Sequence, residues 1–109
     1  MPRLIQAEKS SGNVFADLDV AQPDVALAKA KLAHRISKII QARKLKQVEV
    51  GQILGIGQGR VSALVRGQLA GFSTERMFRF LNAFDQNIEI VVRKKRTSDD
   101  RARVTVAGK

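Results

Sequence analysis

Apolar residues in the second quarter of the chain recur at the spacing of one helix face. They follow the i, i+4, i+7, i+8 pattern that places side chains on one side of an α-helix, and they are Leu32, Ile36, Ile39 and Ile40. Pro23 and Asp24 come just before them. Proline in a first turn, followed by an acidic residue, is typical of a helix start. The pattern therefore predicts a helix over residues 24–43, and the lysines and arginines of this segment, Lys29 among them, are expected on its opposite, basic face.

Three more helices are predicted downstream of this one. A short helix over 47–54 ends at Gly55, and a helix over 58–66 ends at Gly67. Glycine suits the left-handed conformation that closes many helices. Ser73 is a favourable N-cap for the last helix. The apolar residues of that helix share one face and are expected to be packed core: Met77, Phe80, Leu81 and Phe84.

Beyond residue 86 the apolar spacing changes from that of a helix to that of a strand. Ile88, Ile90 and Val92 lie at alternate positions of a β-branched run, which predicts a strand over 87–93. A weaker alternation predicts a second strand over 101–106. Because one or two strands are not stable alone in water, this segment must pack on the helices or pair with another chain. We expect the three alternating side chains to mediate dimerisation.

Residues 47–66 combine the features that a helix-turn-helix requires. Two short helices that cross around a tight turn need a small residue at their closest approach and a residue tolerant of positive φ in the turn. Gly51 and Gly55 occupy these two positions. The inner faces must be apolar, and the residues that supply them are Val50, Leu54, Ile56, Val61 and Leu64. The joint pattern predicts a unit that binds double-stranded DNA.

These elements predict a single, mainly α domain. We expect a helix-turn-helix bundle of four or five helices with a C-terminal β-strand or hairpin. A chain of 109 residues can bury a modest core without disulfides or metals. It divides into a partly ordered N-terminal arm over 1–22, a DNA-binding domain over 23–86, and a C-terminal part over 87–109 with the strands and a basic tail.

The charge of the chain favours an anionic partner. Lys and Arg number 20 against 10 Asp and Glu, which gives a net charge of +10. Residues 25–48 contain many basic residues and no acidic one, and residues 93–109 are again rich in Lys and Arg. A surplus of this size favours nucleic acid. A ribosomal or membrane-surface partner would also suit it, so the charge alone selects only a class of partner.

Several classes of site find no support in the sequence. The chain has no cysteine, which excludes disulfides, thiolate nucleophiles and cysteine-bound zinc. His34 is the sole histidine, and no carboxylate pair lies beside a base. We therefore expect no enzyme, no metal site and no cofactor. We see no signal-peptide pattern and no apolar run near the roughly 20 residues of a membrane helix, so we expect a cytoplasmic protein with no membrane partner.

The outward positions of the second helix of this motif are the predicted base contacts, because residues near its start enter the major groove. Gln58 can pair with adenine, and Arg60 can pair with guanine or a phosphate. Ser62 can bond to several bases, and Ala63 can touch a thymine methyl. Gly59 would let the backbone approach the DNA closely.

Phosphate contacts are predicted at the edges of the motif. Gln47 opens its first helix and should point at a phosphate, as polar groups at helix N-termini do. The other candidates are basic: Arg43, Lys44, Lys46 and Arg66. Each of these four could equally be a solvated surface charge.

The motif resembles the lambda-repressor/Cro family of helix-turn-helix proteins, often called the Xre family. The matching residues are Gln47, Gly55, Ile56, Gln58, the segment 61–64, Arg66 and Gly67. More narrowly, the chain is similar to the HigA-type antitoxin branch over the segments 11–18, 71–76, 80–82 and 86–92. The resemblance implies a lambda-repressor-like bundle and a homodimer that represses its own operon from a palindromic operator. It further implies a RelE/HigB-like toxin protein as partner.

Lys46 departs from the pattern of this family. The family commonly has Thr or Ser before the first glutamine of the motif, where the hydroxyl caps the helix. Lysine there should cost about 1 kcal/mol, unless it contributes to phosphate binding. Gly51 stands where the family often has alanine, and it should weaken the same helix further.

Two other binding functions stay open. The chain could be a protein-binding module that neutralises a RelE-like toxin with little independent DNA binding. An RNA-binding role usually requires exposed aromatic side chains that stack on bases. The five Phe residues fall on apparent core or docked positions, and the chain has no Tyr or Trp.

Overall fold

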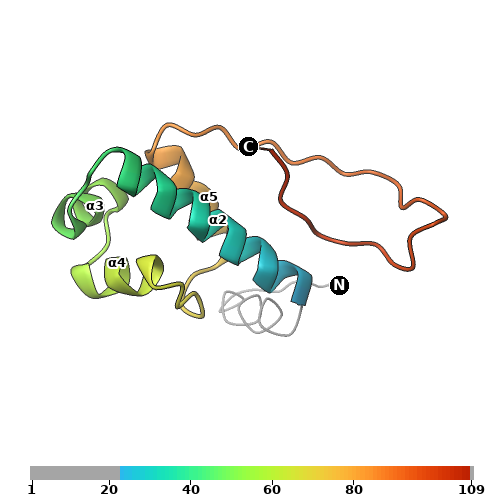
Figure 1. Cartoon of the computed structure of the whole chain (residues 1–109), viewed down its shortest axis with the longest axis horizontal. Helices are drawn as coiled ribbons and strands as arrows, with labels where there is room; N and C mark the ends of the chain where they lie inside the picture. Colours follow the sequence, from blue (N-terminus) through green and yellow to red (C-terminus); the bar gives the residue numbers. More distant parts are fainter. Residues whose placement is uncertain (1–22, 109) are drawn as a thin grey trace, which may run out of the picture.

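The computed structural model describes residues 23–108, and within this range it contains four helices (Figure 1). They are α2 (Pro23–Ala42), α3 (Gln47–Leu54), α4 (Gln58–Val65) and α5 (Thr74–Ala83). The predicted helices over 24–43, 47–54 and 58–66 are confirmed, with ends that differ by one residue at most. Ser73 caps α5 as predicted, because its side-chain oxygen accepts a hydrogen bond from the Arg76 N–H at 3.1 Å. The expected N-terminal arm lies outside the described residues.

A single apolar core joins the four helices. α2 crosses the molecule diagonally with α5 packed against it, and α3 and α4 pack together at one end (Figure 1). Ile36, Val50, Val61, Met77 and Phe84 are fully buried, in agreement with the predicted apolar faces. Burial of a side chain of this size stabilises the fold by about 1.5–3 kcal/mol. Ile39 and Ile40 are half-buried at the edge of the core.

One lysine belongs to this core. Lys29 is only 4% exposed, and its Nζ donates a hydrogen bond of 2.6 Å to the Phe72 carbonyl in the loop before α5. Lys29 precedes Leu32 by three residues and Ile36 by seven, so it lies on the apolar face of α2. It was expected on the basic face of that helix. The helical spacing of Lys29 from Leu32 and Ile36 therefore indicates that this lysine is buried.

Each helix is followed within two residues by a residue with positive φ. These residues are Lys44, Gly55, Gly67 and Asp85, with φ of 55°, 71°, 78° and 65°. After α2, the Leu45 N–H donates to the Ile40 carbonyl at 3.0 Å, the six-to-one bond of a Schellman ending. Glycine adopts this conformation without steric cost, whereas for another residue it costs roughly 1–2 kcal/mol. Lys44 and Asp85 therefore hold backbone strain that the two glycines do not.

The C-terminal segment, residues 86–108, forms a long loop at the end of the molecule opposite α3 (Figure 1). The predicted strand over 87–93 and its hairpin with 101–106 are not formed, since the described residues contain no strand. The physical reason is the lack of a partner: no backbone hydrogen bond joins the two limbs of this loop. Ile88 packs against the core, but Ile90 and Val92 are 72% and 91% exposed.

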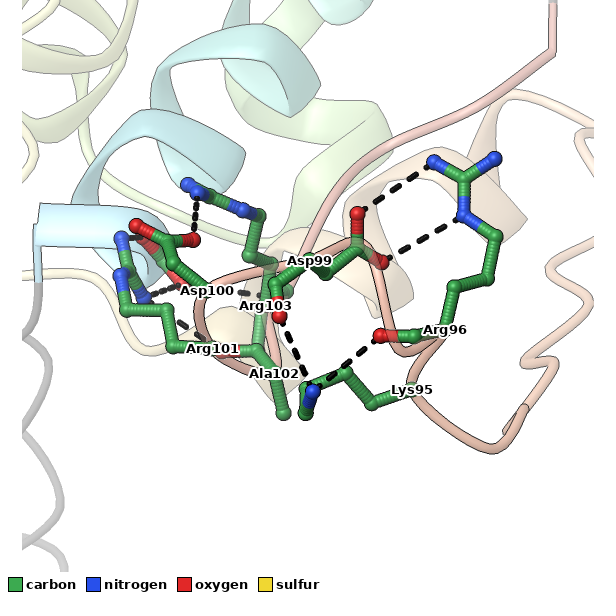
Figure 2. Close-up of polar contacts among 9 residues, drawn as sticks. Lys95, Arg96, Asp99, Asp100, Arg101, Ala102 and Arg103 are labelled. Atoms are coloured by element: carbon green, nitrogen blue, oxygen red, sulfur yellow. Dashed lines mark hydrogen bonds and ion pairs between the residues drawn. The ribbon is translucent and has the colours of Figure 1, made fainter.

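The returning limb of the C-terminal loop is attached to α2 by polar contacts. Arg101 forms a two-pronged ion pair with Asp24 in the first turn of α2, with N–O distances of 2.8 and 2.7 Å. Arg35 on the same helix donates to the Ala107 carbonyl at 3.0 Å. Figure 2 shows the contacts at the tip of the loop, including Arg103 bound to Asp100. The loop therefore has a defined course beside α2.

Attachment of the loop should depend on pH. The hydrogen-bonded guanidinium of Arg101 lowers the pKa of Asp24 from 3.8 to about 2. Because the pKa is lowered in the attached state, the ionised carboxylate favours attachment above about pH 4. That contribution is lost as the pH falls from about 4 to about 2. The Val104 N–H donates to the same carboxylate at 3.3 Å. NMR titration of the Asp24 carboxyl group and of the Val104 amide is therefore expected to give a common midpoint near pH 2.

A matched pair of variants separates this ion pair from the rest of the loop. Asp24→Asn should release the limb at neutral pH, whereas Asp99→Asn removes a contact internal to the loop tip and should leave the limb attached. A midpoint for Asp24 at its ordinary value near 3.8 would contradict the attachment.

Candidate nucleic-acid interface

The turn between α3 and α4 brings two backbone segments into direct contact at Gly51. Its carbonyl accepts hydrogen bonds from the N–H groups of Gly55 and Ile56, at 2.8 and 3.1 Å. A Cβ atom on Gly51 would lie 2.8 Å from the Ile56 carbonyl oxygen, closer than real Cβ atoms approach. Gly51 is therefore required by the turn, and the expectation that it simply weakens α3 is incomplete.

Gly51→Ala is expected to lower the free energy of unfolding by up to about 2 kcal/mol. Overpacking against rigid backbone costs roughly 1–3 kcal/mol, which exceeds the helix propensity of at most about 1 kcal/mol that alanine adds. Gly59→Ala on α4 is the matched control, because nothing lies within 4 Å of its added Cβ. This second variant should be slightly stabilised. Urea unfolding of both variants and of the unaltered chain tests the pair. A Gly51→Ala protein more stable than the unaltered chain would contradict the close approach of Gly51 to the Ile56 carbonyl.

The tight turn fixes α4 so that one face is buried and its first turn faces solvent. Val61 and Leu64 are buried, which confirms the predicted apolar frame. Gln58, Gly59 and Arg66 are exposed. Ser62 and Ala63 are half-buried, and Ala63 also packs against the core. The most accessible predicted base contacts are therefore those in the first turn of the helix.

Arg60 also lies in the first turn of α4, but its guanidinium group contacts its own chain. Its Nη2 donates a hydrogen bond of 2.9 Å to the Gly71 carbonyl. Its Cζ lies 4.5 Å from the centre of the Phe72 ring, within the range of a cation–π interaction. The sequence predicted a contact to guanine or phosphate, and in the structure this side chain connects α4 to the loop before α5.

Arg43 has a similar intramolecular role. Its Nη2 donates to the Phe84 carbonyl at 3.0 Å, and its Cζ lies 5.6 Å from the centre of the Phe84 ring. The Asp85 carboxylate is 3.8 Å away. Arg43 thus binds the C-terminal end of α5 to the end of α2. A cation at the negative end of a helix is favourable, and this contact was missed at the sequence level.

The start of α3 is capped by Glu49, a residue for which no role was predicted. The Glu49 carboxylate accepts a hydrogen bond of 2.7 Å from the Lys46 backbone N–H. Glu49 is the third residue of the helix, the position from which an acidic side chain completes a capping box. This contact offsets part of the expected cost of Lys46 as an N-cap. Lys46, Lys44 and Gln47 are all exposed beside it.

Other types of site receive no support from the part of the chain that the structure describes. Among residues 23–108, no cluster of three His, Cys, Asp or Glu residues could hold a metal ion. No described helix has the length and apolar character needed to cross a membrane. His34, the sole histidine, is exposed on α2.

Comparisons with known proteins agree with this geometry. A family model described as a helix-turn-helix domain matches residues 14–93. A solved structure described as an XRE-family transcriptional regulator is similar, with a TM-score of 0.72 and 42% sequence identity. The match covers 76% of this chain and 93% of that one. No curated protein sequence matches the chain.

Proposed function

Because the chain belongs to the XRE family of helix-turn-helix proteins, we propose that it is a transcriptional regulator that binds a specific double-stranded DNA sequence. The observation that carries this proposal is the orientation of α4. Its first turn presents Gln58 and Gly59 to solvent, while Val61 and Leu64 hold the helix on the core. A helix held in this way can enter the major groove with its N-terminal residues leading.

The base contacts that we propose come from the exposed first turn of α4 and from two half-buried residues that follow it. Gln58 would pair with adenine, and Ser62 would bond to a base edge. Ala63 would touch a thymine methyl, and Gly59 would allow the helix backbone to approach the groove. The exposed position of Gln58 favours it as the main base-reading side chain.

The phosphate contacts would lie on both sides of this helix. Gln47 is at the exposed start of α3, and Arg66 is at the exposed end of α4. Lys44 and Lys46 are exposed in the connection between α2 and α3. The contacts of Arg43 with Phe84 make it a weaker phosphate candidate than these four. Such contacts fix the register of the protein on DNA without reading sequence.

Lys44 offers a test that separates DNA binding from folding. Lys44→Gly should raise the free energy of unfolding by about 0.5–1 kcal/mol, because glycine removes the left-handed strain but enlarges the unfolded ensemble. The same variant should weaken binding to all DNA sequences alike. It should also lower the salt slope, which is the steepness of the fall of log affinity with log salt concentration, by about one. Lys44→Ala should lower the slope equally without the gain in stability. An unchanged slope for both variants would remove Lys44 from the interface.

We also propose a homodimer formed through the C-terminal segment. Ile88, Ile90 and Val92 would form a strand that pairs with the same strand of a second copy. The support is the large exposure of Ile90 and Val92 and the lack of a backbone partner for this segment within the described residues. A two-fold dimer would place its two reading helices about 34 Å apart. A monomer by light scattering at micromolar concentration would overturn this part of the proposal.

The regulatory context that we propose is an autorepressing, cytoplasmic antitoxin that binds a RelE/HigB-like toxin. It rests on the sequence resemblance to HigA-type proteins. The second candidate is a protein-binding module that neutralises such a toxin with little DNA binding. Failure to shift its own promoter fragment at low salt, together with co-purification of a toxin encoded beside it, would favour this second candidate.

Selection of binding sites from a random double-stranded DNA library tests the main proposal. The full chain is expected to enrich a motif with two related half-sites about 10 base pairs apart. Fluorescence anisotropy on the enriched site should show tighter binding than on a scrambled site at the same salt concentration. Enrichment of no motif, with equal affinity for both sites, would overturn the proposal.

A further inference from the structure

We propose that Arg60 is a positioning residue of α4, the proposed recognition helix, and that it contacts no base. It would fix the first turn of α4 against the loop before α5, so that Gln58 and Ser62 meet the bases at a defined angle. This inference rests on the proposed function, because it concerns how α4 reads DNA.

The first turn of α4 has little support of its own. Its N-cap is Gly57, which provides no side-chain hydrogen bond to the helix. No acidic residue lies in the first turn to complement the positive helix end. Gly59 within the turn is a poor helix former, and nothing lies within 4 Å of the place its Cβ would occupy. Residues 58–60 are therefore less firmly held than the body of α4, which the tight turn and the buried Val61 fix on the core, and a contact from another element would limit their movement.

Arg60 supplies that contact with two groups of the same loop. Its guanidinium donates to the Gly71 carbonyl at 2.9 Å and lies 4.5 Å from the centre of the Phe72 ring. The planar guanidinium suits both interactions at once, whereas a lysine ammonium would not stack on the ring in this way. The N–H groups that would pair with guanine lie in the guanidinium plane, and the Nη2 N–H that binds the Gly71 carbonyl is engaged as long as this contact holds.

The loop that Arg60 contacts is itself firmly held. Phe72 is 2% exposed and packs edge-to-face on Phe80 of α5, with ring centres 5.8 Å apart. The Phe72 carbonyl accepts the hydrogen bond from Lys29 of α2, and Ser73 caps α5 directly afterwards. Arg60 thus connects the first turn of α4 to the segment Gly71–Phe72, which contacts with both α2 and α5 hold in place.

Site selection with Arg60→Met tests the assignment, because the three possible roles of this arginine give different results. A positioning residue affects every base contact, so the selected motif should lose information at all positions. Specific affinity should fall about tenfold, while affinity for scrambled DNA stays within about twofold and the salt slope is unchanged. Loss of preference at one base pair alone would show that Arg60 reads a base. A salt slope lowered by about one would show that it binds phosphate, and either result overturns the proposal.

Two further variants complete the test. Arg66→Met removes the same charge from the exposed end of α4, and it should lower the salt slope while the motif keeps its information. Gly57→Ser adds the side-chain cap hydrogen bond that Gly57 lacks. Because serine improves only slightly on glycine at an N-cap, the specific affinity in the Arg60→Met background should recover by less than about twofold. Recovery at all base positions alike would support positioning, because a side-chain cap cannot replace a lost base contact. If the unaltered chain selects no motif, the proposed function itself has failed, which is a different outcome.

Discussion

Lys29→Ala is expected to lower the free energy of unfolding by about 2–4 kcal/mol. The substitution leaves the buried Phe72 carbonyl without its 2.6 Å hydrogen bond, which costs roughly 1–3 kcal/mol. It also removes the aliphatic stem of a side chain packed in the core, and the cavity that remains adds to the loss. Because Phe72 is the residue on which Arg60 stacks, the position of α4 should be loosened as well.

Urea unfolding measures this effect, and two variants divide it into parts. Lys29→Met fills the space of the stem without donating a hydrogen bond, so it should be less destabilised than Lys29→Ala. Lys31→Ala is the control on the same helix, because Lys31 is exposed. Its free energy of unfolding should change by no more than about 0.5 kcal/mol. A Lys29→Ala protein as stable as the control would show that the buried hydrogen bond contributes nothing.

The helices and the tight turn could be predicted because their causes are local in sequence. The spacing of Ile36 and its apolar neighbours determines the buried face of α2, and a glycine can be expected wherever two helices meet closely. The same spacing places Lys29 on the buried face, but its charge led to the opposite assignment. The position of Gly51 was predicted correctly, while its contact with the Ile56 carbonyl became evident only from the structure.

The arginines could not be assigned from sequence, because a guanidinium group has several alternative partners. Arg43 binds the carbonyl and the ring of Phe84, 41 positions away. Arg60 binds the carbonyl of Gly71, 11 positions away, and the ring of the following residue, Phe72. Arg101 binds Asp24 across 77 residues of sequence. A basic residue near a DNA-binding motif suggests a phosphate contact, yet only the three-dimensional arrangement shows whether a carbonyl group lies closer.

The C-terminal segment illustrates the other limit of sequence patterns. The alternation of Ile88, Ile90 and Val92 is typical of a strand, but a strand needs the backbone groups of a neighbour. In the described residues the returning limb attaches to α2 through side chains and does not pair with this segment. An alternating pattern therefore predicts a strand only where a neighbouring strand is available, and residues 23–108 supply none for this segment.

Gly59→Glu is expected to abolish specific DNA binding while the fold becomes slightly more stable. Glutamate is a better helix former than glycine by up to about 1 kcal/mol, and its charge is favourable in the first turn of a helix. The added side chain meets no atom of the protein near its Cβ. In the complex, however, it would place a carboxylate between α4 and the phosphate-lined groove. Like charges brought together in an interface cost several kcal/mol, so affinity should fall at least about 100-fold.

Gly59→Gln is the matched control, since it adds a side chain of nearly the same size without the charge. Any loss of affinity in Gly59→Gln should come only from the size of the added side chain, which would hinder the entry of α4 into the groove, and it should be smaller than in Gly59→Glu. Fluorescence anisotropy on the selected site, with urea unfolding of the same samples, measures both quantities. A Gly59→Glu protein that is stable and still binds the site as tightly as the unaltered chain would place the first turn of α4 away from DNA. The base contacts proposed for Gln58 and Ser62 would then be wrong, whatever the role of Arg60.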